Sequence, residues 1–208
     1  MEKSKKKDTM VGDALKLFVI TLIAGTLLGL VYQVTKVPIA EAKERAKQEA
    51  YQRVFKEAAS FESEETLFGA IDNTTAGVFI SEILVAKDGD GKKIGYVLSF
   101  GSKEGYSGQI DLSMGVDVNG AITGLEVLSM SETAGLGANC TTEEFKKQFN
   151  GIQSGEIVYT KTGKTQDNEI DALSGATITT KAITNGVNNA LAFVYKNCDI
   201  AGKNSVTE

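Results

Sequence analysis

The fold of this chain is decided by two stretches, VFISEILVAKDGDGKKIGYVLSF at residues 78–100 and IDLSMGVDVNGAITGLEVLS at residues 110–129. Each stretch holds two apolar runs rich in β-branched residues, separated by a turn: DGDGKK in the first and Asn119-Gly120 in the second. Runs of this kind joined by Asp-Gly or Asn-Gly turns are typical of β-hairpins. We therefore predict four antiparallel strands, at residues 78–86, 94–100, 110–118 and 122–129.

Helical patterns lie on both sides of these strands in the sequence. Small apolar residues recur every four positions from 39 to 59, which predicts a helix with Pro38 at its start. A short helix should begin with a capping box of Thr141 and Glu144 and end at Gly151. Residues 157–159 predict a strand, and a last helix is expected from about Thr180 to Asn197. The predicted fold class is α+β, a mainly antiparallel sheet with flanking helices.

An uncharged run of 19 residues, from 17 to 35, lies near the N-terminus. At about 1.5 Å per residue it reaches about 28 Å, close to the hydrocarbon thickness of a bilayer. A basic tail precedes it, with Lys3, Lys5, Lys6 and Lys7, and positive charge stays on the cytoplasmic side. We therefore predict a single-pass helix in the cytoplasmic membrane, with the N-terminus inside and the remaining chain outside. The helix predicted after Pro38 should continue it outward as a stalk and then pack on the domain.

The alternative to an anchor is a cleavable signal peptide, for which Ala40-Glu41-Ala42 offers a cleavage site. The apolar run is longer than the usual core of about 7–15 residues in such peptides, which favours the anchor. Residues 1–35 hold five lysines and three acids, which leaves 17 basic and 24 acidic side chains for the outer part. An acidic outer part has no electrostatic reason to bind nucleic acid.

Several kinds of site are excluded by composition. The chain has no histidine, which removes the usual general base and the commonest metal and haem ligand. Its two cysteines, Cys140 and Cys198, are far apart, so they form no zinc or iron–sulfur motif. They could pair as a disulfide, but two separate thiols are the preferred interpretation. We expect no metal site, and no NAD site either, because no GxGxxG follows a strand.

The segment DALSGATITT, at residues 171–180, lies just before the last helix. Gly175 and Ala176 allow a close approach of the backbone to a ligand, and hydroxyls follow on Thr177, Thr179 and Thr180. Unpaired N–H groups at a helix start favour a phosphate, so the residues alone indicate an anion site. The simpler alternative is that these hydroxyls only cap the helix.

The pattern Asp171-x-x-Ser174-Gly-Ala-Thr-x-Thr179 resembles the flavinylation motif of the FMN-binding domain family. In that family a flavinyltransferase moves FMN from FAD onto the last threonine of the motif. The resemblance implies that Thr179 carries FMN through a phosphodiester, with Thr180 and Thr177 as weaker candidates. The resemblance also implies that the cofactor lies against the residues of this segment: Ser174, Gly175, Ala176, Thr177 and Thr180.

A second segment, Ser131-Glu-Thr-Ala-Gly-Leu-Gly137, is similar to the SETPGLG loop of the same family, which lines the flavin. The resemblance makes Glu132, Thr133, Leu136 and Gly137 candidate flavin contacts. Ala134 stands where the family often has proline, which predicts a less rigid loop. The sequence GYSG at 105–108 also matches a family feature, although a plain turn would explain it equally well.

The whole chain resembles the G subunits of Rnf complexes, the ion-translocating ferredoxin:NAD oxidoreductases. The resemblance implies a redox subunit that is not a complete enzyme alone and has no catalytic residue of its own. Its partners would be a flavinyltransferase, a membrane-embedded electron carrier and a second flavin subunit. The implied parts are a basic tail (1–9), a transmembrane helix (10–35), a connecting helix (36–60), an FMN-binding domain (61–200) and a tail (201–208).

Three alternatives remain open. The C subunits of sodium-translocating NADH:quinone reductases share the anchor and the motif but are typically longer. A flavin-free scaffold at the membrane would use 174–180 only as a helix cap. A stand-alone flavin reductase would turn over without partner subunits.

Overall fold

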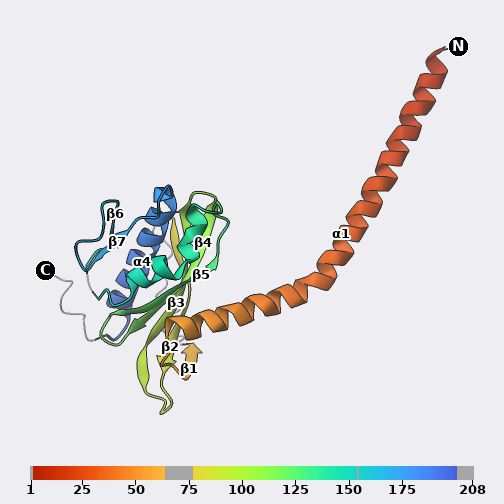
Figure 1. The fold of residues 1–208 in the computed structure, drawn as a ribbon. Helices are drawn as coiled ribbons and strands as arrows, with labels where there is room; N and C mark the ends of the chain where they lie inside the picture. Colours follow the sequence, from red (N-terminus) through yellow and green to blue (C-terminus); the bar gives the residue numbers. More distant parts are fainter. Residues whose placement is uncertain (1, 64–76, 154, 201–208) are drawn as a thin grey trace. The chain divides into compact units, whose positions relative to one another are not determined.

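The computed structural model describes residues 2–63, 77–153 and 155–200, and it consists of two compact units, residues 1–46 and 47–208. Helix α1 (Glu2–Val54) forms the first unit, and its last turns belong to the second unit (Figure 1). The most apolar window of α1 has a mean hydropathy of 2.2 and is not buried. By length and composition, α1 can cross a membrane.

The helix expected at 39–59 continues the apolar helix, as predicted, and the two form the single element α1. Pro38 lies inside α1, which continues to Val54 and ends five residues before the predicted end. A proline inside a helix removes one backbone hydrogen bond and crowds the preceding turn. Here the residues that follow, from Ala40 to Ala50, are all Ala, Glu, Lys, Arg or Gln, which are good helix formers, and the helix continues past Pro38.

The predicted hairpins form one antiparallel sheet. Its strands are β1 (Ser60–Ser63), β2 (Val78–Lys87), β3 (Lys93–Gly105), β4 (Gly108–Asp117) and β5 (Ile122–Ser129), in the order β1-β2-β3-β4-β5. All neighbours in this sheet are antiparallel. The predicted α+β class is therefore confirmed, and the GYSG sequence is the turn between β3 and β4.

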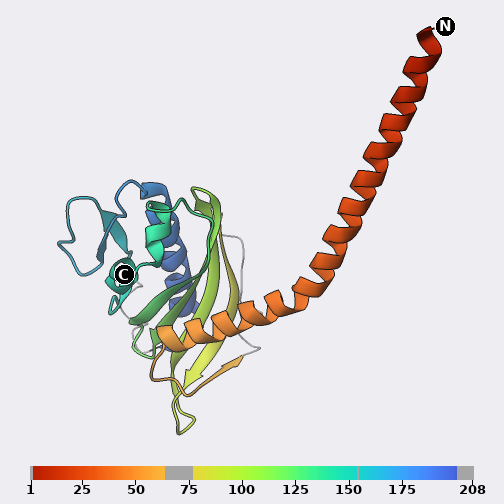
Figure 2. The ribbon, with the colours of Figure 1, turned by 45° about the vertical axis from the view of Figure 1, so that its right-hand side comes forward.

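Both faces of the sheet are buried, and each is covered by a different helix (Figure 2). Helix α4 (Thr177–Asn197) packs on one face, over alternate strand residues such as Leu98, Phe100 and Met114. The last turns of α1 cover the other face, over Leu84, Ala86 and Val97. Successive side chains of a strand point to opposite faces of the sheet, so consecutive residues of β2 and β3 pack into two separate hydrophobic cores.

A notch in the sheet receives the end of α1. Gly115 on β4 and Gly124 on β5 lie opposite each other. A Cβ atom at Gly124 would lie 2.7 Å from the Cα of Val54, and one at Gly115 would lie 2.7 Å from the Val54 carbonyl oxygen. The same carbonyl accepts a hydrogen bond from the hydroxyl of Thr123. The helix backbone therefore rests directly on the two strands.

A polar cluster fastens the same helix end to the sheet. The Tyr51 hydroxyl contacts Glu82 Oε2 at 2.5 Å and Ser99 Oγ at 2.9 Å, and Lys47 pairs with the same Glu82 carboxylate. Burial, followed by the hydrogen bond to Glu82, raises the pKa of Tyr51 to about 12. The residues that join the helix to the domain are thus both apolar and hydrogen-bonded.

Short elements connect β5 to α4: η1 (Gly137–Thr141), α3 (Glu143–Lys146), η2 (Lys147–Phe149), β6 (Val158–Thr160) and β7 (Glu169–Asp171). The predicted capping box at Thr141 is wrong by one residue. The N-cap of α3 is Thr142, whose hydroxyl accepts the N–H of Phe145, because Thr141 belongs to the preceding 3-10 turn. Strand β6 agrees with the strand predicted at 157–159, and strands β1 and β7 were not predicted.

Candidate functional site

Residues 174–180, called here the SGATITT segment, form the start of α4. The helix begins at Thr177, three residues before the predicted start. Gly175 has a φ of +72°, a left-handed conformation that favours glycine, and this turn lets the helix begin two residues later. Thr179 therefore lies in the first turn of the helix and not before it.

The N-cap of α4 is Ala176, and no side chain caps it by a hydrogen bond. The interpretation that the hydroxyls of this segment only cap the helix is therefore wrong. The first N–H groups of an α-helix have no partner within the helix. An uncapped start leaves these groups, together with the positive end of the helix dipole, available to an anion.

Thr179 and Glu132 meet at the centre of the site. The hydroxyl of Thr179 donates a hydrogen bond to Glu132 Oε2 at 2.7 Å. Thr179 is 1% exposed and Glu132 is 8% exposed. The other carboxylate oxygen, Glu132 Oε1, accepts the backbone N–H of Ser107 at 3.0 Å. Three segments distant in the sequence thus meet here: the β3–β4 turn, the loop after β5 and the start of α4.

The loop after β5, residues 131–137, is called here the SETAGLG loop. Its last residue, Gly137, packs directly against Glu132 and Thr179. A Cβ atom at Gly137 would lie 2.5 Å from Glu132 Oε2 and 2.6 Å from Thr179 Oγ1. Any side chain at this position would therefore separate or displace the pair. Glycine is needed at 137 because the backbone passes directly over the hydrogen bond.

The other threonines of the segment have different surroundings. Thr180 is fully buried, donates to the Ala176 carbonyl oxygen at 3.0 Å and accepts the Leu173 N–H at 3.0 Å. Thr177 is half-buried, and Ser174 lies exposed before the helix. Among these three threonines, it is therefore Thr179 whose hydroxyl contacts a carboxylate.

Three large apolar side chains lie exposed on the segments that form the site. Tyr106 is 69% exposed, Leu136 is 44% exposed and Ile178 is 52% exposed. A Cβ atom at Gly175 would lie 3.0 Å from Leu136 Cδ2, so the SETAGLG loop and the SGATITT segment are in contact. Leu136 and Ile178 thus expose apolar side chains on the two segments that carry the buried Thr179–Glu132 pair.

Thr133 and Ala134 form the outer part of the SETAGLG loop, and both are exposed. The carbonyl oxygen of Thr133 accepts the N–H of Leu136 at 3.1 Å. Gly135 has a φ of +77°. This hydrogen bond and this φ are those of a type II turn with Ala134 at its second position, where proline is common. The turn therefore forms here without proline.

Ala134→Pro should raise the free energy of unfolding by about 0.4–1 kcal/mol, because proline restricts the unfolded chain where the folded backbone already suits it. Urea denaturation of the full chain in detergent, followed by circular dichroism, measures the change. Ala138→Pro is the matched control and should be destabilising, because the Ala138 N–H donates to the Thr133 carbonyl. A less stable Ala134→Pro variant would show that the loop is not this turn.

Cys140 lies just beyond the site and is fully buried. Burial, followed by the negative charge of Glu132, raises the pKa of its thiol to about 11. Cys198 is also a buried thiol, in agreement with the preferred interpretation of two separate cysteines. The Cys140 thiol therefore does not have the lowered pKa of a reactive cysteine.

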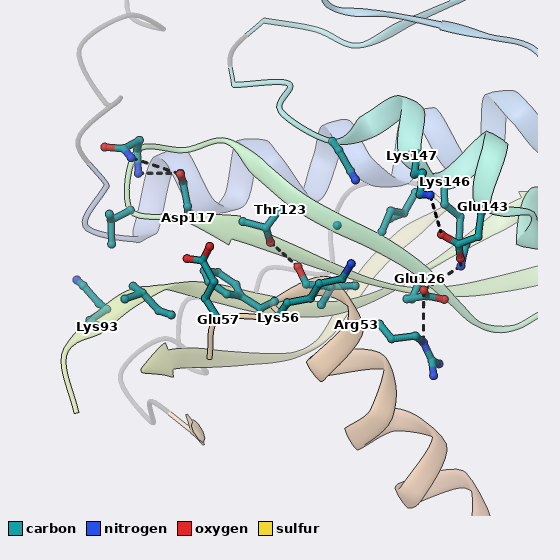
Figure 3. Close-up of a pocket in the computed structure, with 18 of the residues that line it drawn as sticks. Arg53, Lys56, Glu57, Lys93, Asp117, Thr123, Glu126, Glu143, Lys146 and Lys147 are labelled. Atoms are coloured by element: carbon teal, nitrogen blue, oxygen red, sulfur yellow. Dashed lines mark hydrogen bonds and ion pairs between the residues drawn. The ribbon is translucent and has the colours of Figure 1, made fainter. Parts of the chain in front are cut away.

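A hollow of about 740 Å³ lies elsewhere in the domain, between the end of α1, β5 and α3 (Figure 3). Several of its charged side chains pair with one another: Glu126 contacts both Arg53 and Lys146, and Lys146 also pairs with Glu143. None of the sequence-predicted site residues lines it. We therefore place the candidate site at Thr179 and not in this hollow.

The FMN-binding domain family matches residues 105–192, which include both the SETAGLG loop and the SGATITT segment. Among solved structures, the C subunit of the Na⁺-translocating NADH-quinone reductase from Parabacteroides distasonis matches with 27% identity and a TM-score of 0.48. That match covers 55% of this chain and 60% of the other, too little for a functional argument.

Curated relatives match nearly the whole chain. The G subunit of the Na⁺-translocating ferredoxin:NAD⁺ oxidoreductase complex of Acetobacterium woodii is 34% identical, over 87% of this chain and 89% of the relative. The G subunit of the proton-translocating ferredoxin:NAD⁺ oxidoreductase complex of Clostridium ljungdahlii is 30% identical, over 92% of this chain and 95% of the relative. From these matches and the long apolar helix α1 we conclude that the protein is membrane-anchored. The chain belongs to the family of G subunits of ion-translocating ferredoxin:NAD⁺ oxidoreductase complexes and contains an FMN-binding domain.

Proposed function

We propose that this chain carries FMN covalently on Thr179 and relays electrons between other subunits of an ion-translocating ferredoxin:NAD oxidoreductase complex. The observation that carries the proposal is the hydroxyl of Thr179, held against a carboxylate in the first turn of a helix without a side-chain cap. The membership of the chain in the family of G subunits supports the electron-relay part.

The residues at the site fit a phosphate-linked flavin. The start of α4 offers N–H groups and the positive end of the helix dipole to a phosphate. Leu136, Ile178 and Tyr106 offer exposed apolar surface to a flat ring. Bound FMN would supply a ring that takes up and releases one or two electrons. A phosphodiester at Thr179 leaves that ring unmodified and prevents loss of the flavin.

The proposed partners are a flavinyltransferase, a membrane-embedded electron carrier and a second flavin subunit. We place the N-terminus in the cytoplasm and the FMN-binding domain outside, because Lys3, Lys5, Lys6 and Lys7 precede the apolar helix. Added protease should then digest the domain in spheroplasts and leave it intact in inverted vesicles. The coupling ion belongs to the whole complex, since relatives of similar identity are named for Na⁺ and for protons.

Covalent flavin is the direct test of the proposal. The full chain is expressed with and without a flavinyltransferase, denatured and examined for flavin fluorescence on the gel. Trypsin should release residues 165–181, which end at Lys181, with the added mass of FMN less one water. Fragmentation of this peptide should assign the added mass to Thr179. A dark band in the presence of an active transferase would reject covalent attachment and favour a flavin-free scaffold.

A further inference from the structure

The neighbouring hydroxyls of Thr179 and Thr180 differ in the group that accepts their proton. Thr179 Oγ1 donates to the carboxylate of Glu132 at 2.7 Å. Thr180 Oγ1 donates to a backbone carbonyl, that of Ala176, at 3.0 Å. A carboxylate can take up a proton at moderate pH, whereas an amide carbonyl is far too weak a base. Only the first arrangement joins a potential nucleophile to a potential base.

A second contact orients Glu132 independently of Thr179. Its Oε1 atom accepts the backbone N–H of Ser107 in the turn between β3 and β4. The carboxylate is therefore fixed at one oxygen by the sheet, while its other oxygen faces α4.

We propose that Glu132 is the general base that prepares Thr179 to accept flavin, and that it selects Thr179 over the neighbouring hydroxyls. This inference rests on the proposed covalent attachment of FMN to Thr179. A threonine hydroxyl is a weak nucleophile at neutral pH and is activated by an adjacent base. The flavinyltransferase brings the flavin donor, and this chain supplies both the nucleophile and its base.

The donor is FAD, a flavin dinucleotide. Thr179 Oγ1 forms a bond to the phosphorus of the FMN half, and the bond between that phosphorus and the oxygen bridging to the AMP half breaks. AMP leaves with the electron pair of the broken bond. The hydroxyl proton of Thr179 passes to Glu132 Oε2 and then to solvent. No oxidation or reduction occurs, and the products are the threonyl phosphodiester and AMP.

The same geometry explains why a buried residue is the acceptor. Ser174 and Thr177 are more exposed than Thr179, so access alone would favour them. They lie outside the Thr179–Glu132 contact, and Thr180 is held by Leu173 and Ala176. Selection by a base therefore predicts modification at Thr179, whereas selection by exposure predicts it at Ser174 or Thr177.

The test measures the rate of flavin attachment and not the redox activity of the loaded chain. Full-length chain from a host without transferase is mixed in detergent with purified flavinyltransferase and FAD, and covalent flavin is followed by fluorescence on denaturing gels. Glu132→Gln keeps an oxygen that can accept the Ser107 N–H but removes the base. Glu104→Gln is the matched control, because exposed Glu104 contacts Asn185 and not Thr179.

Glu132→Gln should attach flavin at least about 100-fold more slowly than wild type, and Glu104→Gln should stay within about twofold, since a general base typically contributes 10²–10⁴-fold. A purely structural role of Glu132 would lower the melting temperature of Glu132→Gln together with its rate of attachment, whereas loss of the base lowers the rate alone.

A folded Glu132→Gln variant, with a melting temperature near that of wild type, that is labelled at the wild-type rate would overturn the proposal. If Glu132→Gln does not fold, Glu132→Asp decides, because it keeps the charge and sets the carboxylate back by one methylene. A folded Glu132→Asp variant at the wild-type rate overturns the proposal, and a slower one supports it. A wild-type chain that accepts no flavin would instead reject the covalent attachment on which the inference rests.

Discussion

A Thr179→Val chain should carry no covalent flavin, even after long co-expression with a flavinyltransferase. Valine has the shape of threonine and a similar helix propensity, but a methyl group replaces the hydroxyl that is proposed to form the phosphodiester. The substitution also removes the hydrogen bond to Glu132 Oε2. Leaving that buried oxygen without its donor should cost about 1–3 kcal/mol of stability. Fluorescence on denaturing gels measures the flavin, and thermal unfolding measures the stability.

Two matched variants separate loss of the nucleophile from damage to the helix. Thr177→Val lies in the same helical turn and is half-buried, and it should keep full labelling at Thr179. Thr179→Ser keeps a hydroxyl at the same position and should retain labelling. Flavin on a Thr179→Val chain, assigned by fragmentation to Thr177 or Thr180, would contradict the choice of acceptor.

Gly124→Ala should lower the free energy of unfolding by about 1–3 kcal/mol, the usual cost of overpacking a well-filled interior. The new methyl group would lie 2.7 Å from the Cα of Val54 and 3.0 Å from its carbonyl oxygen. These atoms belong to the helix backbone, so no side-chain rotation can relieve the contact. The end of α1 must move away from β4 and β5, and the hydrogen bond from Thr123 to the Val54 carbonyl must weaken.

Urea denaturation of the full chain in detergent measures this change. Gly89→Ala is the matched control, because no atom lies within 4 Å of the position that its Cβ would take. An exposed substitution of this kind should change stability by at most about 0.5 kcal/mol. Equal stabilities of the two variants would show that α1 does not rest on the sheet at Gly124.

The sequence predicted most of the sheet because the information is local. Apolar alternation and the turns at Asp88-Gly89 and Asn119-Gly120 are contained within each hairpin, and the four predicted strands agree with β2 to β5. The helix boundaries were less accurate. Helix α1 ended at Val54, five residues before the predicted end, and α4 began at Thr177, because the turn at Gly175 already directs the chain into the helix.

The centre of the candidate site could not be derived from local patterns. Glu132 and Thr179 are 47 positions apart, and no periodicity links a loop glutamate to a helix threonine. Resemblance to the FMN-binding domain family named both residues but gave Glu132 only as a flavin contact. The notch at Gly115 and Gly124 was missed for a similar reason, since its occupant, Val54, lies far away in the sequence.

Formation of a phosphodiester at Thr179 would consume the hydrogen that now joins α4 to Glu132. The chain without FMN has this hydrogen bond, and a chain with FMN on Thr179 cannot form it. Leu136 and Ile178 lie exposed on the two segments that the bond connects. A partner protein that docks on these side chains would therefore meet two segments joined by this hydrogen bond before FMN is attached, and the same segments without it afterwards. Such a difference would allow the complex to incorporate chains that carry FMN and to exclude chains that lack it.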